Sequence, residues 1–207
     1  MEFALTGLSE SEAYYAFAQV VVPRPIAWVL TDNGPDATPG SDANRWNLAP
    51  FSYFNAITSA PPMVMFSIGN GMAGRDKDTH RNLRARPHCT ICLASANQAT
   101  AVQATADELP PGVSEVSHAG LALSAWAGEL PRIATAPVAM DCTATQFTQV
   151  GTTEQIVVFA AVHRLWLRDD IGSLDDRGRL RVDVAAFNPL ARLGRGGYAP
   201  LGAAFRP

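Results

Sequence analysis

Short apolar runs bounded by turn residues dominate the hydrophobic pattern of this chain. Residues 26–31, 63–68 and 89–93 each form such a run, and Gly, Pro, Asn or Asp residues lie near their ends. Runs of this length between turn residues are typical of buried strands. We therefore expect three strands in the first half of the chain.

Residues 140–150 and 155–167 alternate between apolar and polar positions, as strands with one face toward a core do. The segment 151–153 between them contains a glycine and two threonines, which predicts antiparallel strands joined by a turn. His163 falls on the same strand face as Val157 and other apolar residues. A histidine in such a place is more often structural than catalytic.

Helix patterns are fewer. Ser9 and Glu12 have the spacing of a capping box, which predicts a helix that begins beside them. A short polar helix is expected before Pro87, and the alanine-rich segment 97–106 predicts another. Residues 32–45 predict a long loop, either a lid or a tolerated insertion. Short strands with few helices indicate a mainly β, barrel-like fold with appended helices.

Composition narrows the classes of partner. The chain has 207 residues, 47% hydrophobic and 17% charged, which suits one globular domain over residues 1–207. The formal net charge is −3, so no basic balance favours nucleic acid or an anionic membrane surface. No segment approaches the roughly 20 apolar residues of a spanning helix, and the N-terminus lacks a signal peptide's basic region. We expect a cytoplasmic protein that binds neither nucleic acid nor membranes.

Cysteine usage points to reduced thiols. Cys89, Cys92 and Cys142 are too few for a disulfide framework. Cys89 and Cys92 have redox-motif spacing, but residues three apart on a strand point to opposite faces. We interpret them as buried core residues. No set of His, Cys, Asp and Glu has metal-site spacing, so no metal is expected.

The glycines after residue 68 invite comparison with dinucleotide-binding folds. Gly69, Gly71 and Gly74 follow a strand and match the expected glycine spacing. Those folds also need an acidic residue about 20 positions later. The chain has no Asp or Glu from Thr79 to Ala106, so we reject that interpretation.

The residues after these glycines favour a phosphate site. Lys77 follows them, with Arg75 and Arg81 close in sequence, at the expected start of a helix. Glycines let backbone N–H groups approach a phosphate, and a helix N-terminus adds donors and a positive dipole end. We expect a phosphate-binding corner within residues 69–82.

Five segments along the chain carry a familiar order of motifs. They are Val22–Val29, Asn47–Asn55, Pro61–Pro62, Lys77–Thr79 with Asn82, and Ala191–Gly194 with Tyr198. Together they resemble the flavin reductase-like, FMN-binding split-barrel family over most of the chain. The sequence Asn-Leu-Ala-Pro-Phe-Ser at 47–52 is the most specific part.

The resemblance implies a six-stranded antiparallel split β-barrel. It also implies a homodimer with FMN near the subunit interface and NAD(P)H as co-substrate. One departure is visible, because the 32–45 loop is longer than the family's usual turn and Trp46 stands directly before the motif. Both lie where the edge of the flavin ring and the approaching nicotinamide are expected.

Nine residues are candidates for cofactor binding on the basis of this resemblance. They are Arg24, Thr31, Asn47, Ala49, Ser52, Ser67, Lys77, Thr79 and Asn82. Lys77 and Thr79 would hold the phosphate, the lysine through a charge-assisted bond. Arg24 could reach the phosphate or pair with a surface acid.

The remaining candidates are assigned to the rest of the flavin. Ser52 and Ser67 would bond the ribityl chain or the phosphate. Thr31, Asn47 and Ala49 would line the ring, Ala49 mainly through its backbone. For each hydroxyl the alternative is local capping of the backbone, which Ser and Thr commonly provide.

Hydride transfer between nicotinamide and flavin needs orientation and water exclusion more than a catalytic side chain. We therefore expect a binding site without catalytic residues. Two functions stay open: an NAD(P)H-dependent flavin reductase that could feed a partner oxygenase, and a flavoredoxin-like electron carrier that keeps its FMN. A flavin-binding protein without redox turnover is a third.

Overall fold

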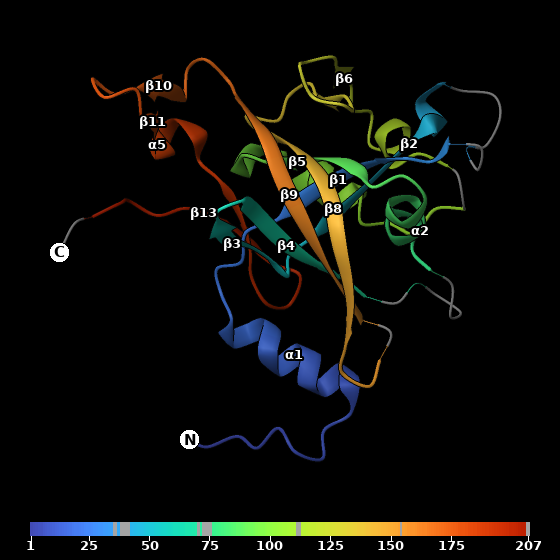
Figure 1. Cartoon of the computed structure of the whole chain (residues 1–207). Coiled ribbons are helices and arrows are strands. Elements are labelled where there is room, and N and C mark those ends of the chain that lie inside the picture. The colour runs from blue at the N-terminus through green and yellow to red at the C-terminus, as the bar shows by residue number, and fades with distance from the viewer. Residues whose placement is uncertain are drawn as a thin grey trace.

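The computed structural model describes residues 1–34, 37, 42–69, 71, 76–110, 113–153 and 155–205. Its main feature is an antiparallel sheet in the strand order β2-β1-β5-β8-β9-β4-β3 (Figure 1). The strands are β1 (Ala27–Asp32), β2 (Trp46–Phe51), β3 (Phe54–Ser59), β4 (Pro62–Ile68), β5 (His88–Leu93), β8 (Val138–Val150) and β9 (Gln155–Leu167).

The two edges of this sheet are adjacent along the chain. Strand β2 lies at one edge and β3 at the other, yet only Ser52 and Tyr53 connect them. The Phe51 ring of β2 packs against the Phe66 ring of β4, with centroids 5.4 Å apart. The sheet therefore curls until its edges approach, as in a split barrel.

The expected number of six strands is not confirmed, since the described residues form a sheet of seven. The edge strand β3 pairs with β4 from Phe54 to Ser59. It separates from β2 because the turn at Ser52 and Tyr53 interrupts the extended backbone. The mainly β class with appended helices is confirmed.

Helices and small hairpins surround the sheet. The helices are α1 (Glu10–Val20), η2 (Asp42–Arg45), α2 (Asp78–Ala85), η4 (Ala96–Gln98), α3 (Ala99–Ala104), α4 (Glu115–His118) and α5 (Val184–Phe187). The hairpins pair β6 (Leu123–Ser124) with β7 (Arg132–Ile133), β10 (Gly172–Leu174) with β11 (Leu180–Val182), and β12 (Leu190–Arg192) with β13 (Tyr198–Pro200). Among the described residues, no helix has both the length and the apolar character needed to cross a bilayer.

Most elements that the pattern predicts are present. The capping box of Ser9 and Glu12 begins α1, and β8 and β9 form the expected hairpin. Helices η4 and α3 cover residues 97–104 of the alanine-rich segment 97–106. Of the predicted 32–45 loop, Asp42–Arg45 form η2, whereas residues 35–36 and 38–41 lie outside the described part.

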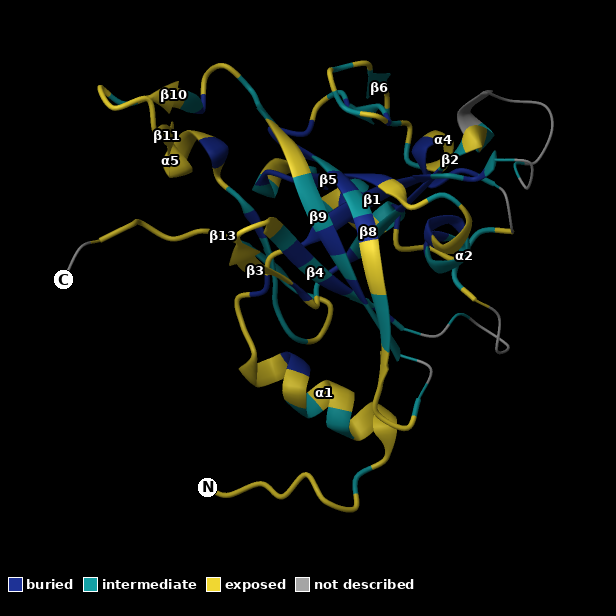
Figure 2. Cartoon of the chain, viewed as in Figure 1, coloured by how far each residue is buried: buried dark blue, intermediate teal, exposed yellow. Residues whose placement is uncertain are grey.

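Apolar residues on both faces of the sheet are buried, and Figure 2 shows buried residues at its centre. Cys89 belongs to one core cluster and Cys92 to another, although both lie on β5. This confirms that the two thiols point to opposite faces and act as core residues. The indole of Trp28 donates to the Thr105 hydroxyl at 2.8 Å and so ties the end of α3 to the sheet.

The predicted face of β9 that carries His163 is the less buried one. Val158 and Ala160, on the other face, are buried, whereas His163 is exposed. Its Nε2 atom lies 2.9 Å from the Thr143 hydroxyl on β8. His163 therefore has a structural partner across the strands.

Candidate functional site

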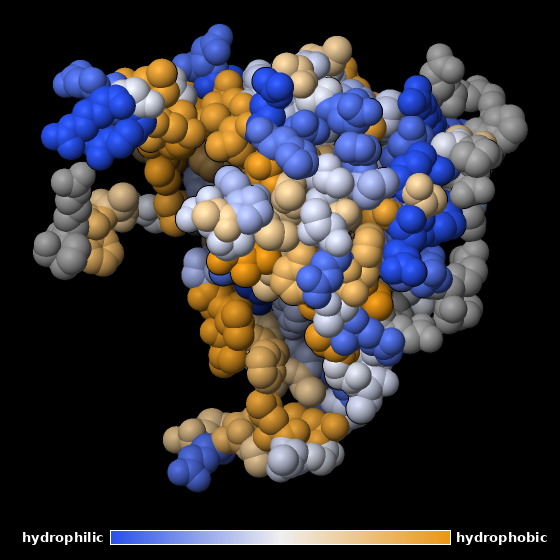
Figure 3. All heavy atoms as spheres, in the orientation of Figure 1, coloured by the Kyte–Doolittle hydropathy of each residue, from blue (hydrophilic) through white to orange (hydrophobic). Residues whose placement is uncertain are grey.

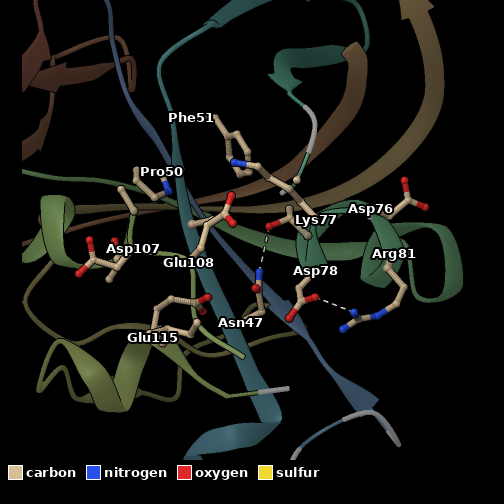
Figure 4. A pocket seen from close by; sticks show the side chains of 16 residues that line it. Asn47, Pro50, Phe51, Asp76, Lys77, Asp78, Arg81, Asp107, Glu108 and Glu115 are labelled. Atoms are coloured by element: carbon tan, nitrogen blue, oxygen red, sulfur yellow. Dashed lines mark hydrogen bonds and ion pairs between the residues drawn. The ribbon is translucent and has the colours of Figure 1, made fainter. Parts of the chain in front are cut away.

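A cavity of about 420 Å³ lies between β2, the start of α2 and the segment that follows α3 (Figure 4). This volume is within the range of small-molecule sites. Its lining residues are Asn47, Ala49, Pro50, Phe51, Gly71, Asp76, Lys77, Asp78, Thr79, Arg81, Thr105, Ala106, Asp107, Glu108, Leu109 and Glu115. Four of the nine predicted residues are among them: Asn47, Ala49, Lys77 and Thr79.

A buried hydrogen-bond network joins β1, β2 and α2 next to the residues that line the cavity. The Asn47 amide donates to the hydroxyls of Thr31 at 3.1 Å and Thr79 at 2.9 Å. The Asn82 amide donates to Thr31 at 3.1 Å and to the side-chain oxygen of Asn33 at 2.8 Å. All five residues are at most 3% exposed.

This network brings together four predicted residues, Thr31, Asn47, Thr79 and Asn82. Each amide uses both of its N–H groups on protein acceptors, so the network fixes the position of α2 against the sheet. Thr31 and Asn82 support the wall from behind without lining the cavity. Direct contact between these residues and a ligand stays a prediction.

Lys77 is at the N-cap position of α2 and makes no side-chain cap hydrogen bond. Its side chain extends along the cavity toward Phe51 (Figure 4). The eight-residue helix behind it presents backbone donors and a positive dipole end. One wall of the cavity is thus suited to an anion. The predicted contributions of Gly74 and Arg75 lie outside the described residues.

Acidic side chains occupy much of the remaining wall. Arg81 and Asp78 form an ion pair at 2.6 Å within the lining. Asp107 and Glu108 are exposed at the rim, after α3. Asp76 and Asp78 flank Lys77 in the lining, so the acidic residues of the cavity outnumber the basic residues Lys77 and Arg81.

Glu115 is the buried member of this acidic wall, with 8% of its surface exposed. Its Oε2 atom accepts the Leu48 amide N–H at 2.9 Å. Burial raises the pKa of Glu115 from 4.5 to about 7; the Leu48 N–H and His118 act against the shift, and the Asp78 charge adds to it. The carboxyl can hold a proton near neutral pH.

Arg24 and the two predicted serines are not among the lining residues. The Arg24 guanidinium is buried and donates to the carbonyls of Ala18 at 2.9 Å, Val21 at 2.7 Å and Leu193 at 3.1 Å. Its Nε also reaches the Ser52 hydroxyl at 3.5 Å. In this chain Arg24 anchors the end of α1. For Arg24 and for Ser52, a role in phosphate binding stays a prediction.

Ser67 lies on β4, where its hydroxyl accepts a hydrogen bond from the Gln155 side chain of β9. This contact joins two neighbouring strands, and Ser67 is also absent from the lining of the cavity. Its contact with a ribityl chain or phosphate stays a prediction.

Sequence reasoning missed the acidic wall. Glu115 directly precedes residues 116–126, whose pattern does not distinguish helix from loop. Ser114 caps α4 by accepting the Val116 N–H. That Ser-Glu pair is a helix-start pattern and could have located α4. Nothing local indicates that α4 lies against β2.

Residues 19–182 match the family model described as flavin reductase like domain. The chain belongs to the flavin reductase-like family. An uncharacterized protein of Deinococcus radiodurans is 35% identical over 198 residues, covering 95% of this chain and 84% of the relative.

Two solved structures extend this likeness of the flavin reductase-like chain to the fold. Nitrilotriacetate monooxygenase component B from Bacillus cereus is 25% identical with a TM-score of 0.86, covering 100% of this chain and 98% of that one. The 2-nitrobenzoate 2-nitroreductase of Pseudomonas fluorescens is also 25% identical, with a TM-score of 0.84 and coverages of 100% and 95%.

The cavity of this flavin reductase-like chain has the donors that a flavin nucleotide needs. Lys77 and the start of α2 are suited to its phosphate. Ala49, Pro50 and Phe51 give an apolar strand surface with backbone polar groups, suited to a planar ring. The residues present therefore fit the group.

Proposed function

We propose that this single-domain protein binds FMN in the cavity and reduces flavin with NAD(P)H. The main support is the placement of Lys77 and the start of α2 opposite Ala49–Phe51, in a chain of the flavin reductase-like family. Bound flavin would supply the hydride-accepting ring. Lys77 would hold the phosphate, and Asn47, fixed by its two hydrogen bonds, would hold β2 in the shape that receives the ring.

The electrons are proposed to leave with the reduced flavin, toward a partner oxygenase. The support is the likeness to component B of a monooxygenase, over the whole chain. The alternative is a carrier that keeps its FMN and passes electrons on.

Anaerobic mixing of the protein with NADH or NADPH and excess free FMN separates these functions. Reduction of many flavin equivalents per protein is expected from a reductase. Reduction that stops after one equivalent, or no turnover with either nucleotide, would overturn the reductase and favour the carrier.

The phosphate assignment is tested by Lys77→Gln, which removes the charge and keeps a polar side chain. Loss of a charge-assisted contact is expected to weaken FMN roughly tenfold. Riboflavin lacks the phosphate, so its affinity should hardly change. Arg84→Gln is the matched control, because Arg84 is exposed on the same helix and does not line the cavity. Equal weakening of FMN and riboflavin would refute the assignment.

We also propose a homodimer, as the family resemblance implies. Exposed apolar side chains gather over α1, β3 and the turn before β3 (Figure 3), including Tyr14, Phe17, Tyr53 and Ile57. Tyr14 of α1 and Tyr53 of the turn lie side by side, with ring centroids 6.3 Å apart. Light scattering should give the mass of two chains, and Ile57→Glu should shift it toward one. A monomer with full FMN occupancy would overturn this proposal.

A further inference from the structure

Glu115 is a buried carboxyl in the wall of the cavity that none of the roles above uses. It begins α4, which packs against β2, and it accepts the Leu48 N–H at 2.9 Å. Leu48 lies between Asn47 and Ala49, the part of β2 that is proposed to receive the flavin ring. Figure 4 shows the Glu115 carboxyl beside Asn47 and apart from Lys77.

The charged groups around Glu115 are mostly acidic. From α2 and the two residues before it the cavity receives Asp76, Lys77, Asp78 and Arg81, and Asp78 is paired with Arg81. From the segment after α3 come Asp107 and Glu108, and α4 itself contributes His118. Arg45 of η2 is engaged with Asp32 at 3.2 Å.

The protonation state of Glu115 decides what it offers to a ligand. With burial raising its pKa to about 7, the carboxyl is neutral in mildly acidic solution and ionised in mildly alkaline solution. The neutral form can donate a hydrogen bond, whereas the ionised form only accepts and adds a negative charge. The Leu48 N–H is satisfied by either form.

Reduction changes the charge of the group beside this carboxyl. A hydride carries one proton and two electrons, so its transfer from the nicotinamide leaves an originally neutral flavin ring with one negative charge. A carboxylate close to that ring repels the product but not the oxidised substrate. In a partly buried cavity such repulsion is weakly screened.

We propose that Glu115 is a specificity-determining residue that makes the cavity bind oxidised flavin more tightly than anionic reduced flavin. The inference rests on the proposed function. In its ionised form, Glu115 promotes release of the reduced flavin that a partner would use. In its neutral form, the two oxidation states are held more equally.

The test compares dissociation constants of oxidised and chemically reduced flavin, measured by anaerobic fluorescence and absorbance titration without nicotinamide. Wild type, Glu115→Gln and the control Glu129→Gln are each titrated with FMN and with riboflavin, at about pH 6 and about pH 8.5. Glu129→Gln removes the same charge from an exposed position that does not line the cavity. For each variant, the dissociation constant of reduced flavin is divided by that of oxidised flavin, and this ratio is then divided by the wild-type ratio. This normalisation cancels the titration of the flavin itself.

At the higher pH, Glu115→Gln is expected to lower that ratio about tenfold for both ligands. At the lower pH the change should stay within roughly twofold, because wild-type Glu115 is then neutral. Glu129→Gln should have little effect at either pH, because its charge lies outside the cavity and is screened by solvent.

Three results would overturn the inference: an unchanged ratio in Glu115→Gln, an equal effect in Glu129→Gln, or an effect on FMN but not on riboflavin. The last would place Glu115 near the phosphate. Binding of oxidised flavin by wild type separates these failures from failure of the proposed function, in which no flavin binds. Folding of Glu115→Gln is verified by its circular dichroism, and Glu115→Asp, which keeps the charge, should retain part of the discrimination.

Discussion

The helices α1 and α2 are held in this fold in opposite ways. Helix α1 begins with a complete capping box at Ser9 and Glu12, yet Ala18 is its only buried residue. Its attachment runs through Arg24, whose guanidinium donates to carbonyls at the end of the helix. Residues within α1 and at its cap therefore determine where the helix begins, and few of its side chains pack against the rest of the fold.

Helix α2 has no side-chain cap at Lys77 but buries Thr79, Asn82 and Leu83 against the sheet. Short helices gain most of their stability from such packing rather than from local propensity. The position of α2, the helix at the cavity, therefore depends on strands that are distant in sequence. The helix with the clearest local pattern contributes little to the core.

The largest effect is expected for Leu83→Ala in α2. Leu83 is 1% exposed and belongs to a core cluster, so truncation should lower the free energy of unfolding by about 2–5 kcal/mol. Tyr15→Ala in α1 is the counterpart, expected to cost under about 0.5 kcal/mol in the monomer because Tyr15 is 60% exposed. Urea unfolding at low protein concentration measures both. Similar losses of unfolding free energy in the two variants would contradict the difference between α1 and α2.

A smaller, pH-dependent effect is expected for Glu115→Gln. The folded-state pKa of Glu115 is about 7 against an ordinary 4.5, so between these values the native state keeps a proton that the unfolded chain has lost. Wild-type stability should therefore fall as pH rises through this window and then level off. Gln cannot ionise, so the variant should gain up to about 3 kcal/mol relative to wild type by pH 8, as compared with pH 4. A pH-independent difference in urea unfolding would contradict this.

Arg24→Met should act mainly on α1. Removing the guanidinium leaves the Ala18 and Val21 carbonyls without that donor, at an expected cost of about 1–2 kcal/mol. Because α1 is peripheral, hydrogen exchange should rise within Glu10–Val20 while α2 keeps its protection. Equal loss of protection in α2 would show that the two helices are coupled.

The smallest effect is expected for Ser9→Ala, which removes the cap of α1. Loss of an N-cap costs about 0.5–1 kcal/mol in exposed helices. Hydrogen exchange of the first turn should rise, with no change in FMN affinity. A weakened FMN affinity would mean that α1 contributes to the site.

The elements that could be predicted from the sequence are those that depend on residues close together in the chain. The cap of α1 and the β8–β9 hairpin depend on neighbouring residues, so their patterns sufficed. The edge strand β3 and the network around Asn47 depend on contacts between segments far apart in sequence. No local pattern specifies such contacts.

The site residues show this division at single positions. Lys77 and Asn47 were predicted from the family motifs, and they do line one cavity. Arg24 belongs to the same motifs, but its side chain reaches three carbonyls that come close only in the folded chain. Glu115 was missed because its importance comes from burial against Leu48, 67 positions away.

The reactivity of the three cysteines can be used to follow unfolding of this protein. All are fully buried, with Cys89 and Cys142 in one core cluster and Cys92 in the other. Burial raises the pKa of Cys92 to about 12, which further depletes the reactive thiolate. A thiol-labelling reagent should therefore modify a cysteine only when its side of the sheet opens. Mass spectrometry of partly labelled chains would then show whether the two faces of the barrel come apart together or in turn.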